Sequence, residues 1–272
     1  MTPAQRYVRI AREGSPAYGV VEDAEVAVIE PHPFAPNRPT GERLPLEGLR
    51  LLAPVIPSKL VCVGKNYHAH AAEFGGEVPD EPLFFLKPSS TVIGPGEPIL
   101  LPTDRSDEVH HEAELAVVVG ALLQRVGPDE AAAGILGYTA ANDVTARDLQ
   151  RRESQWFRAK GFDSFCPLGP AIATGLDPSK LAVRCYVDDQ LRQDGTTADL
   201  VWDVPTLLAE ISQIMTMLPG DVVLTGTPAG VGPLLPGETV RVEIDGIGAL
   251  ENPVLDRQAE PVPAERGDGR KA

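Results

Sequence analysis

The chain has 272 residues, 43% of them hydrophobic, which is enough for one large domain and a smaller one with a substantial buried core. Its formal net charge of −15 gives it no electrostatic reason to bind nucleic acid or an anionic membrane. No apolar run approaches the ~20 residues of a membrane span, and three cysteines without CxxC spacing favour a cytoplasmic protein without disulfides.

The first part of the chain, residues 1–57, is predicted to be a small β-rich N-terminal domain. Short β-like pieces occupy residues 7–10 and 18–29, and the Pro-rich polar stretch 31–49 is typical of a connection. The larger domain is expected to cover residues 58–257. The tail, residues 258–272, has charges, Pro and Gly without apolar periodicity, and it is predicted to be disordered.

Short strands bounded by Gly and Pro dominate the larger domain, for example at 181–187, 221–224 and 239–244. Two helices are also predicted. One covers 204–218, where apolar residues recur at helical spacing after a capping Asp203. The other covers 67–74, between a capping Asn66 and Gly75. The fold class is therefore α+β, mostly β.

The second of these helices carries a candidate general base. His70 and Glu73 are three residues apart, so their side chains share a helix face and can hydrogen-bond. The carboxylate would then orient the imidazole towards a water molecule. An ordinary exposed His–Glu pair is the alternative. His68 lies off this face and is expected to be exposed to solvent.

A strand predicted over 111–120 begins with two carboxylates, Glu112 and Glu114. Residues i and i+2 of a strand point to the same face, so these side chains should lie side by side. Adjacent carboxylates beside a buried apolar run repel each other, and a hard divalent cation removes that repulsion. Asp143, at the end of the next apolar stretch, would complete an all-oxygen site suited to Mg²⁺ or Mn²⁺. From spacing alone, an equal alternative is that Glu112 and Glu114 are charges at the rim of the domain and Asp143 caps a helix.

Groups that can bind an anion follow this acidic trio. Arg147 and Gln150 are three residues apart and can face one site. Lys160 lies among aromatic residues and is expected to be partly buried, where it can hold a substrate carboxylate. Thr227 lies in the Gly-rich turn 224–232, whose backbone N–H groups can approach an anion. Surface salt bridges and a simple tight turn are the alternatives.

Six segments of the larger domain, taken together, resemble the fumarylacetoacetate hydrolase family. They lie in family order at 61–73, 84–88, 112–115, 142–148, 160–169 and 219–232. The resemblance covers about residues 58–254, and it implies mixed β-sheets rolled around the site, with a small variable N-terminal domain and a homodimeric assembly. Lys65 occupies a position that varies in the family and is assigned no role.

The resemblance also implies roles for individual residues. It implies that Mg²⁺ or Mn²⁺ is held by Glu112, Glu114 and Asp143. It implies that the substrate is contacted by Arg147, Gln150, Lys160 and Thr227, with Lys160 also counted among the catalytic groups. In family members that cleave C–C bonds, a lid helix supplies a His–Glu pair, which maps onto His70 and Glu73.

The implied reaction uses a small anionic 2-oxo acid and passes through a metal-bound enolate. Hydrolysis of a C–C bond in an acylpyruvate or fumarylpyruvate-type substrate, or decarboxylation of oxaloacetate, is favoured, because an isomerase does not require the water that a His–Glu pair activates. Isomerisation of 2-hydroxyhepta-2,4-diene-1,7-dioate in aromatic catabolism is the first alternative. Non-catalytic binding of a small acid is the second.

A zinc hydrolase is set aside. Its candidate ligands would be His68, His70, His110 and His111. The first two are two positions apart on a short helix, and the last two are neighbours on a strand, so in each pair the rings point to different faces.

Overall fold

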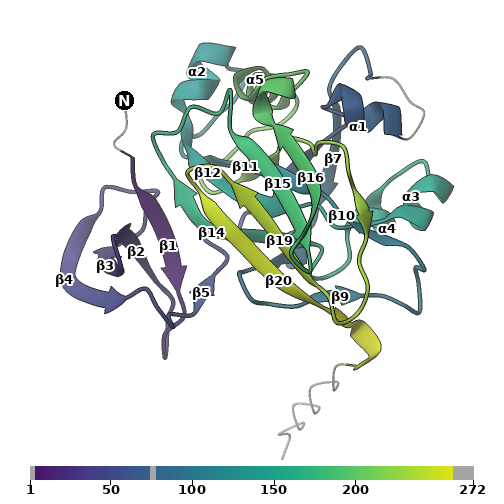
Figure 1. Ribbon diagram of the computed structural model, residues 1–272. Helices are drawn as coiled ribbons and strands as arrows, with labels where there is room; N and C mark the ends of the chain where they lie inside the picture. Colours follow the sequence, from purple (N-terminus) through teal and green to yellow (C-terminus); the bar gives the residue numbers. More distant parts are fainter. Residues whose placement is uncertain (1–3, 74–77, 260–272) are drawn as a thin grey trace, which may run out of the picture.

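The computed structural model describes residues 4–73 and 78–259, and their β-strands form three sheets (Figure 1). The first four strands lie to one side of the larger part and pair as antiparallel neighbours in chain order. They are β1 (Arg6–Ile10), β2 (Ala17–Glu22), β3 (Glu25–Glu30) and β4 (Arg38–Pro45). β1 also pairs with β14, so both parts of the chain share one sheet. The domain boundary at residue 57 stays a prediction.

The expectation of a plain connection over 31–49 is wrong, because β4 lies within it. This strand is at the edge of the sheet, and nearly all of its side chains are exposed. It is therefore held by backbone pairing with β3 rather than by an apolar face. An edge strand of this kind leaves no alternation of apolar and polar residues for a sequence pattern to reveal.

The largest sheet has the order β4-β3-β2-β1-β14-β12-β11-β17-β6-β7, with β5 beside β1 and β8 beside β14. Its remaining strands are β5 (Leu51–Leu52), β6 (Leu60–Gly64), β7 (Leu83–Lys87), β8 (Val92–Ile93), β11 (Ala113–Val119), β12 (Ile135–Asn142), β14 (Cys166–Ala173) and β17 (Val222–Leu224). A second sheet contains β9 (Ile99–Leu101), β15 (Ala182–Val187), β16 (Gln190–Thr196), β19 (Thr239–Ile244) and β20 (Gly248–Asp256). A small third sheet contains β10 (Val109–His111), β13 (Thr145–Ala146) and β18 (Gly232–Pro233).

Strand β11 is buried on both faces, which explains its nearly continuous apolar sequence. Leu115 and Val117 belong to the main core, together with residues of β15 and β19 from the second sheet. Ala116 and Val118 belong to a second apolar cluster on the opposite face. A carboxylate placed on this strand is therefore surrounded by apolar packing.

The helices are α1 (His68–Glu73), α2 (Pro128–Ala133), α3 (Arg147–Arg152), α4 (Phe157–Lys160) and α5 (Val204–Ile214), with 3₁₀ turns η1 (Ser89–Thr91), η2 (Thr197–Asp199) and η3 (Arg257–Ala259). The Asp203 side chain accepts a hydrogen bond from the backbone of Thr206, which confirms the predicted cap of α5. The predicted end at 218 is wrong. Reciprocal backbone hydrogen bonds between Leu123 and Met217 hold the chain in an extended bridge after Ile214.

The mostly-β fold class is confirmed by this set of elements. Among the described helices, none has the length and apolar character needed to cross a membrane. Cys62, Cys166 and Cys185 are free and buried, and burial raises the pKa of each thiol, to about 12 for the last two. Of the predicted tail, residues 258 and 259 end η3, and residues 260–272 lie outside the described part of the chain. Gly75, the predicted stop of the first helix, also lies outside it.

Candidate metal centre and active site

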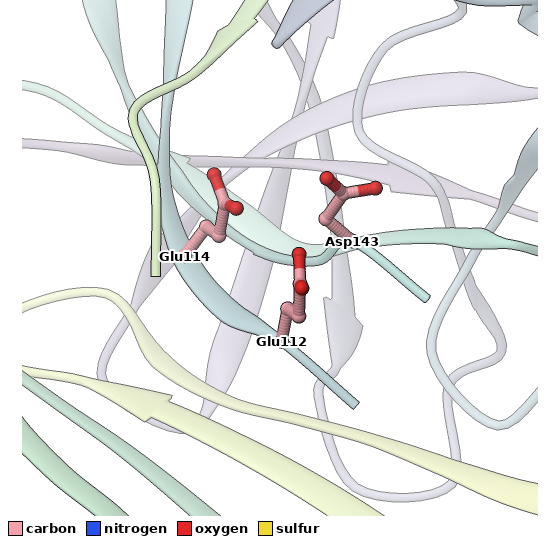
Figure 2. A group of neighbouring side chains, drawn as sticks. All are labelled: Glu112, Glu114 and Asp143. Atoms are coloured by element: carbon pink, nitrogen blue, oxygen red, sulfur yellow. The ribbon is translucent and has the colours of Figure 1, made fainter. Parts of the chain in front are cut away.

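The three predicted metal ligands come together near the start of β11 and the end of β12. Glu112 lies in the break between β10 and β11, Glu114 is the second residue of β11, and Asp143 follows β12. Figure 2 shows their carboxyl groups directed towards a common space, and one oxygen of each lies within 4.8 Å of the others. All three are nearly inaccessible to solvent. No other group of this kind occurs in residues 4–73 and 78–259.

Backbone pairing between the two strands explains why the carboxylates meet. The antiparallel register sets Ala113 opposite Asn142, so the residues on either side of this pair are neighbours. The backbone N–H of Asp143 donates to the carbonyl of Glu112 at 2.8 Å, and the N–H of Glu112 donates to the Asn142 side chain at 2.9 Å. Glu112 is thus outside a regular strand, yet its side chain still converges with that of Glu114.

Buried cations compensate two of the carboxylates. Lys160 donates to Glu112 at 2.8 Å and to Asp143 at 2.6 Å, and Arg147 forms an ion pair with Glu112. Burial alone would raise the pKa of Glu112, but the charges of Lys160 and Arg147 outweigh it and hold that pKa below its ordinary value. Burial also opposes the charge of Lys160, yet the two carboxylates raise its pKa.

Glu114 is in a different electrostatic position. Its carboxylate accepts a 2.7 Å hydrogen bond from the N–H of Gly226, which adopts a left-handed φ of +101°. Burial and the charges of Asp143 and Glu112 raise its pKa well above the ordinary value. The buried cations pair with Glu112 and Asp143, and in the described part of the chain no cationic side chain is paired with Glu114 itself. A hard divalent cation would stabilise the ionised form of Glu114, and the three oxygen donors fit Mg²⁺ or Mn²⁺.

The trio lies at a cavity of about 180 Å³. Eight of the nine predicted site residues line it: His70, Glu112, Glu114, Asp143, Arg147, Gln150, Lys160 and Thr227. A cavity of this size suits a small organic acid rather than a large ligand. The expectation that Lys160 is partly buried understates its burial, because only 2% of its surface is exposed.

The ninth predicted residue, Glu73, lies behind His70. Its Oε2 is 3.1 Å from Nδ1 of His70, and its Oε1 accepts a 2.7 Å hydrogen bond from the N–H of Gly230. In the tautomer whose Nδ1–H donates to this carboxylate, Nε2 carries no proton and can accept one. His68 is exposed, as expected, and His70 on the same helix is buried, which excludes the ordinary exposed pair.

The predicted substrate-binding side chains already form hydrogen bonds or ion pairs within the protein. Arg147 donates to Gln150 at 2.7 Å in addition to its ion pair with Glu112. The Thr227 hydroxyl donates to the carbonyl of Ala113 at 2.9 Å and accepts from Gln193 at 2.7 Å. Their roles towards a substrate stay predictions.

Two residues at the site carry no role in the sequence interpretation. Gln193 of β16 is fully buried. Its side-chain amide forms hydrogen bonds with His111, Ala113, Thr227 and the carbonyl of Pro228. It lies in a polar segment that gives no sequence signal. Lys87 ends the apolar strand β7 and donates to Asp143 at 2.5 Å and to the carbonyl of Val144 at 3.1 Å. A lysine in an apolar run hints at a buried carboxylate partner without identifying it.

The histidines of the rejected zinc site do not form a cluster. His111 is buried, its Nδ1 is 3.0 Å from Gln193, and burial lowers its pKa to about 4. His110 lies 3.1 Å from Glu108. Only His70 of the four histidines lines the pocket with the acidic trio.

Replacing Lys87 with methionine is expected to weaken Mn²⁺ binding by about 10- to 100-fold, the usual effect of losing a partner that orients a metal ligand. The reason is that Lys87 holds one oxygen of Asp143 while Lys160 holds the other, so the two lysines together orient this candidate ligand. Calorimetric titration with Mn²⁺ measures the change, and Lys180→Met, at an exposed lysine, is the matched control. An unchanged affinity would contradict this role.

Comparison with protein families matches nearly the whole described chain. Residues 59–255 match the family described as "Fumarylacetoacetate (FAA) hydrolase C-terminal", and residues 5–54 match "Rv2993c-like, N-terminal". Protein Rv2993c of Mycobacterium tuberculosis is 50% identical over 236 residues, 86% of this chain and 88% of that protein. The human mitochondrial oxaloacetate tautomerase FAHD2A is 43% identical over 225 residues, 78% of this chain and 71% of that protein.

Solved structures agree with these matches. The 2-hydroxyhepta-2,4-diene-1,7-dioate isomerase from Mycobacterium marinum is 44% identical, covers 93% of this chain and 99% of its own, and superposes with a TM-score of 0.86. A maleylpyruvate hydrolase from Sphingobium, in complex with Mn²⁺ and pyruvate, is 33% identical, covers 92% of this chain and 99% of its own, and has a TM-score of 0.77.

Proposed function

This chain belongs to the fumarylacetoacetate hydrolase family, and on that premise we propose that it hydrolyses a C–C bond of an acylpyruvate or fumarylpyruvate-type 2-oxo acid. The observation that carries the proposal is the His70–Glu73 pair in the same cavity as the acidic trio. The relative that binds Mn²⁺ and pyruvate is named as a hydrolase of a related substrate, which supports it.

The metal, Mg²⁺ or Mn²⁺ at Glu112, Glu114 and Asp143, would supply Lewis-acid stabilisation of the enolate that develops when the C–C bond breaks. His70 takes a proton from a water molecule while Glu73 holds the ring in orientation. The hydroxide attacks the carbonyl of the acyl group, and the bond to C3 of the pyruvyl unit breaks. Lys160 and Arg147 add positive charge beside the departing pyruvate enolate.

A second candidate function needs no attacking water. Decarboxylation of oxaloacetate gives the same enolate by loss of CO₂, and tautomerisation or isomerisation needs proton transfer alone. The oxaloacetate tautomerase and the dienedioate isomerase among the relatives favour testing these reactions beside hydrolysis. The homodimer and the cytoplasmic location stay predictions.

The test is incubation of the Mn²⁺-loaded protein with acetylpyruvate, fumarylpyruvate, oxaloacetate and a 2-hydroxydienedioate. Pyruvate release and loss of enol absorbance are followed together, with EDTA-treated protein as control. Metal-dependent pyruvate release from an acylpyruvate would support hydrolysis. Release from oxaloacetate alone, or loss of absorbance without pyruvate, would instead support the second candidate. No change with any substrate would favour the binding of a small acid without turnover.

A further inference from the structure

The charges of the pocket are unevenly paired. Its cationic lining residues are Lys65, Arg147, Arg151 and Lys160. Arg147 and Lys160 are paired with the carboxylates of the metal centre, and Arg151 forms an ion pair with Glu108. The Lys65 ammonium has neither an ion pair nor a hydrogen bond with any residue in the part of the chain that the structure describes. Lys65 is therefore the lining cation whose charge is available to a ligand.

The backbone holds Lys65 in an uncommon conformation. Its φ is +56°, a left-handed value that non-glycine residues adopt only where the surrounding structure holds them in it. The next residue, Asn66, is fully buried and fixes this geometry. Its side chain donates to the carbonyls of Trp202 and Thr225 at 3.1 and 2.8 Å and accepts from the N–H of Trp202 at 2.9 Å. Lys65 is thus held at the cavity by a rigid support.

Much of the remaining lining is apolar. Val63, Gly64, Ala71, Phe85 and Trp156 contribute apolar surface. The rings of Phe85 and Trp156 pack edge to face with centroids 5.3 Å apart. Such a wall suits the carbon chain of a ligand, whereas a carboxylate on that chain needs a cation that is not already neutralised.

We propose that Lys65 binds a distal carboxylate of the substrate, so that the pocket selects 2-oxo dicarboxylates over 2-oxo acids with a neutral tail. The inference rests on the proposed function, because it takes the first carboxylate and the 2-oxo group to be held at the acidic trio. It makes Lys65 a specificity-determining residue.

The experiment compares two ligands of equal length, 2-oxoadipate and 2-oxohexanoate, which differ only in the distal carboxylate. Their affinities for the Mn²⁺-loaded protein are measured by calorimetry. We expect the wild type to bind 2-oxoadipate about 10- to 100-fold more tightly, as for a charge-assisted contact. Lys65→Met should bring the ratio close to one by weakening 2-oxoadipate alone. Lys65→Arg should keep the preference, and Lys180→Met, at an exposed lysine, should leave it unchanged.

Binding without turnover separates this inference from the proposed function. If no substrate released pyruvate but Lys65→Met still removed the preference for the dicarboxylate, hydrolysis would be wrong and the role of Lys65 would stand. A preference that survives Lys65→Met would overturn the role of Lys65, whatever the turnover. The role of Lys65 would also be overturned if Lys65→Met and the less hydrophobic Lys65→Gln lowered the affinities for both ligands equally. A wild type that bound the two ligands with the same affinity would overturn it as well.

Discussion

Glu114→Gln is expected to abolish metal-dependent catalysis and to weaken Mn²⁺ binding by more than about 100-fold, a larger effect than losing a partner of a ligand. The substitution removes one of three carboxylate ligands but keeps an oxygen that can accept from the N–H of Gly226. Activity is measured as pyruvate release and metal binding by calorimetry. Glu210→Gln, at an exposed position on α5, is the matched control.

The same variant should not lose stability in the absence of metal. The pKa of Glu114 is raised in the folded protein by burial and by Asp143 and Glu112, so its ionisation near pH 7 disfavours the folded state. A neutral glutamine removes that cost, and the Tm measured in EDTA should equal or exceed that of the wild type. A Tm that falls by many degrees together with activity would mean that Glu114 acts in folding rather than in metal binding.

His70→Asn is expected to lower acylpyruvate hydrolysis by about 10²- to 10⁴-fold, the range of general-base catalysis, and to leave Mn²⁺ affinity nearly unchanged. Asparagine has an N–H that can replace Nδ1 as a donor to Glu73, but it has no basic nitrogen for the water. Decarboxylation of oxaloacetate, which needs no attacking water, should change only a few-fold. The kcat of both reactions is measured at saturating metal.

His68→Asn is the control for this prediction, because His68 lies on the same helix with its side chain exposed. If His70→Asn left hydrolysis intact, His70 would not be the base. If it reduced both reactions equally, His70 would act in substrate binding rather than in activation of water.

Sequence reasoning succeeded where the signal was local. Strand β19 has the predicted bounds, and the start of α5 follows from the Asp203 cap. The pairing of His70 with Glu73 also follows from helical spacing alone. Each of these features is determined by residues within one turn or one strand.

The failures came where distant segments decide the outcome. Strand β4 depends on the exposed edge of β3, and the end of α5 depends on Leu123, far away in sequence. The contact of Lys87 with the candidate metal centre depends on Asp143, which lies 56 residues further on. The unpaired charge of Lys65 becomes visible only when every other cation of the pocket has a partner.

The two oxygens of Glu73 link separate parts of the molecule: one contacts the imidazole of His70, and the other is bound by the backbone of Gly230. Any rearrangement that moves α1 away from the turn around Gly230 breaks the second bond and releases the carboxylate that aligns the imidazole. If His70 is the base, its orientation therefore depends on the position of the turn around Gly230 as well as on α1.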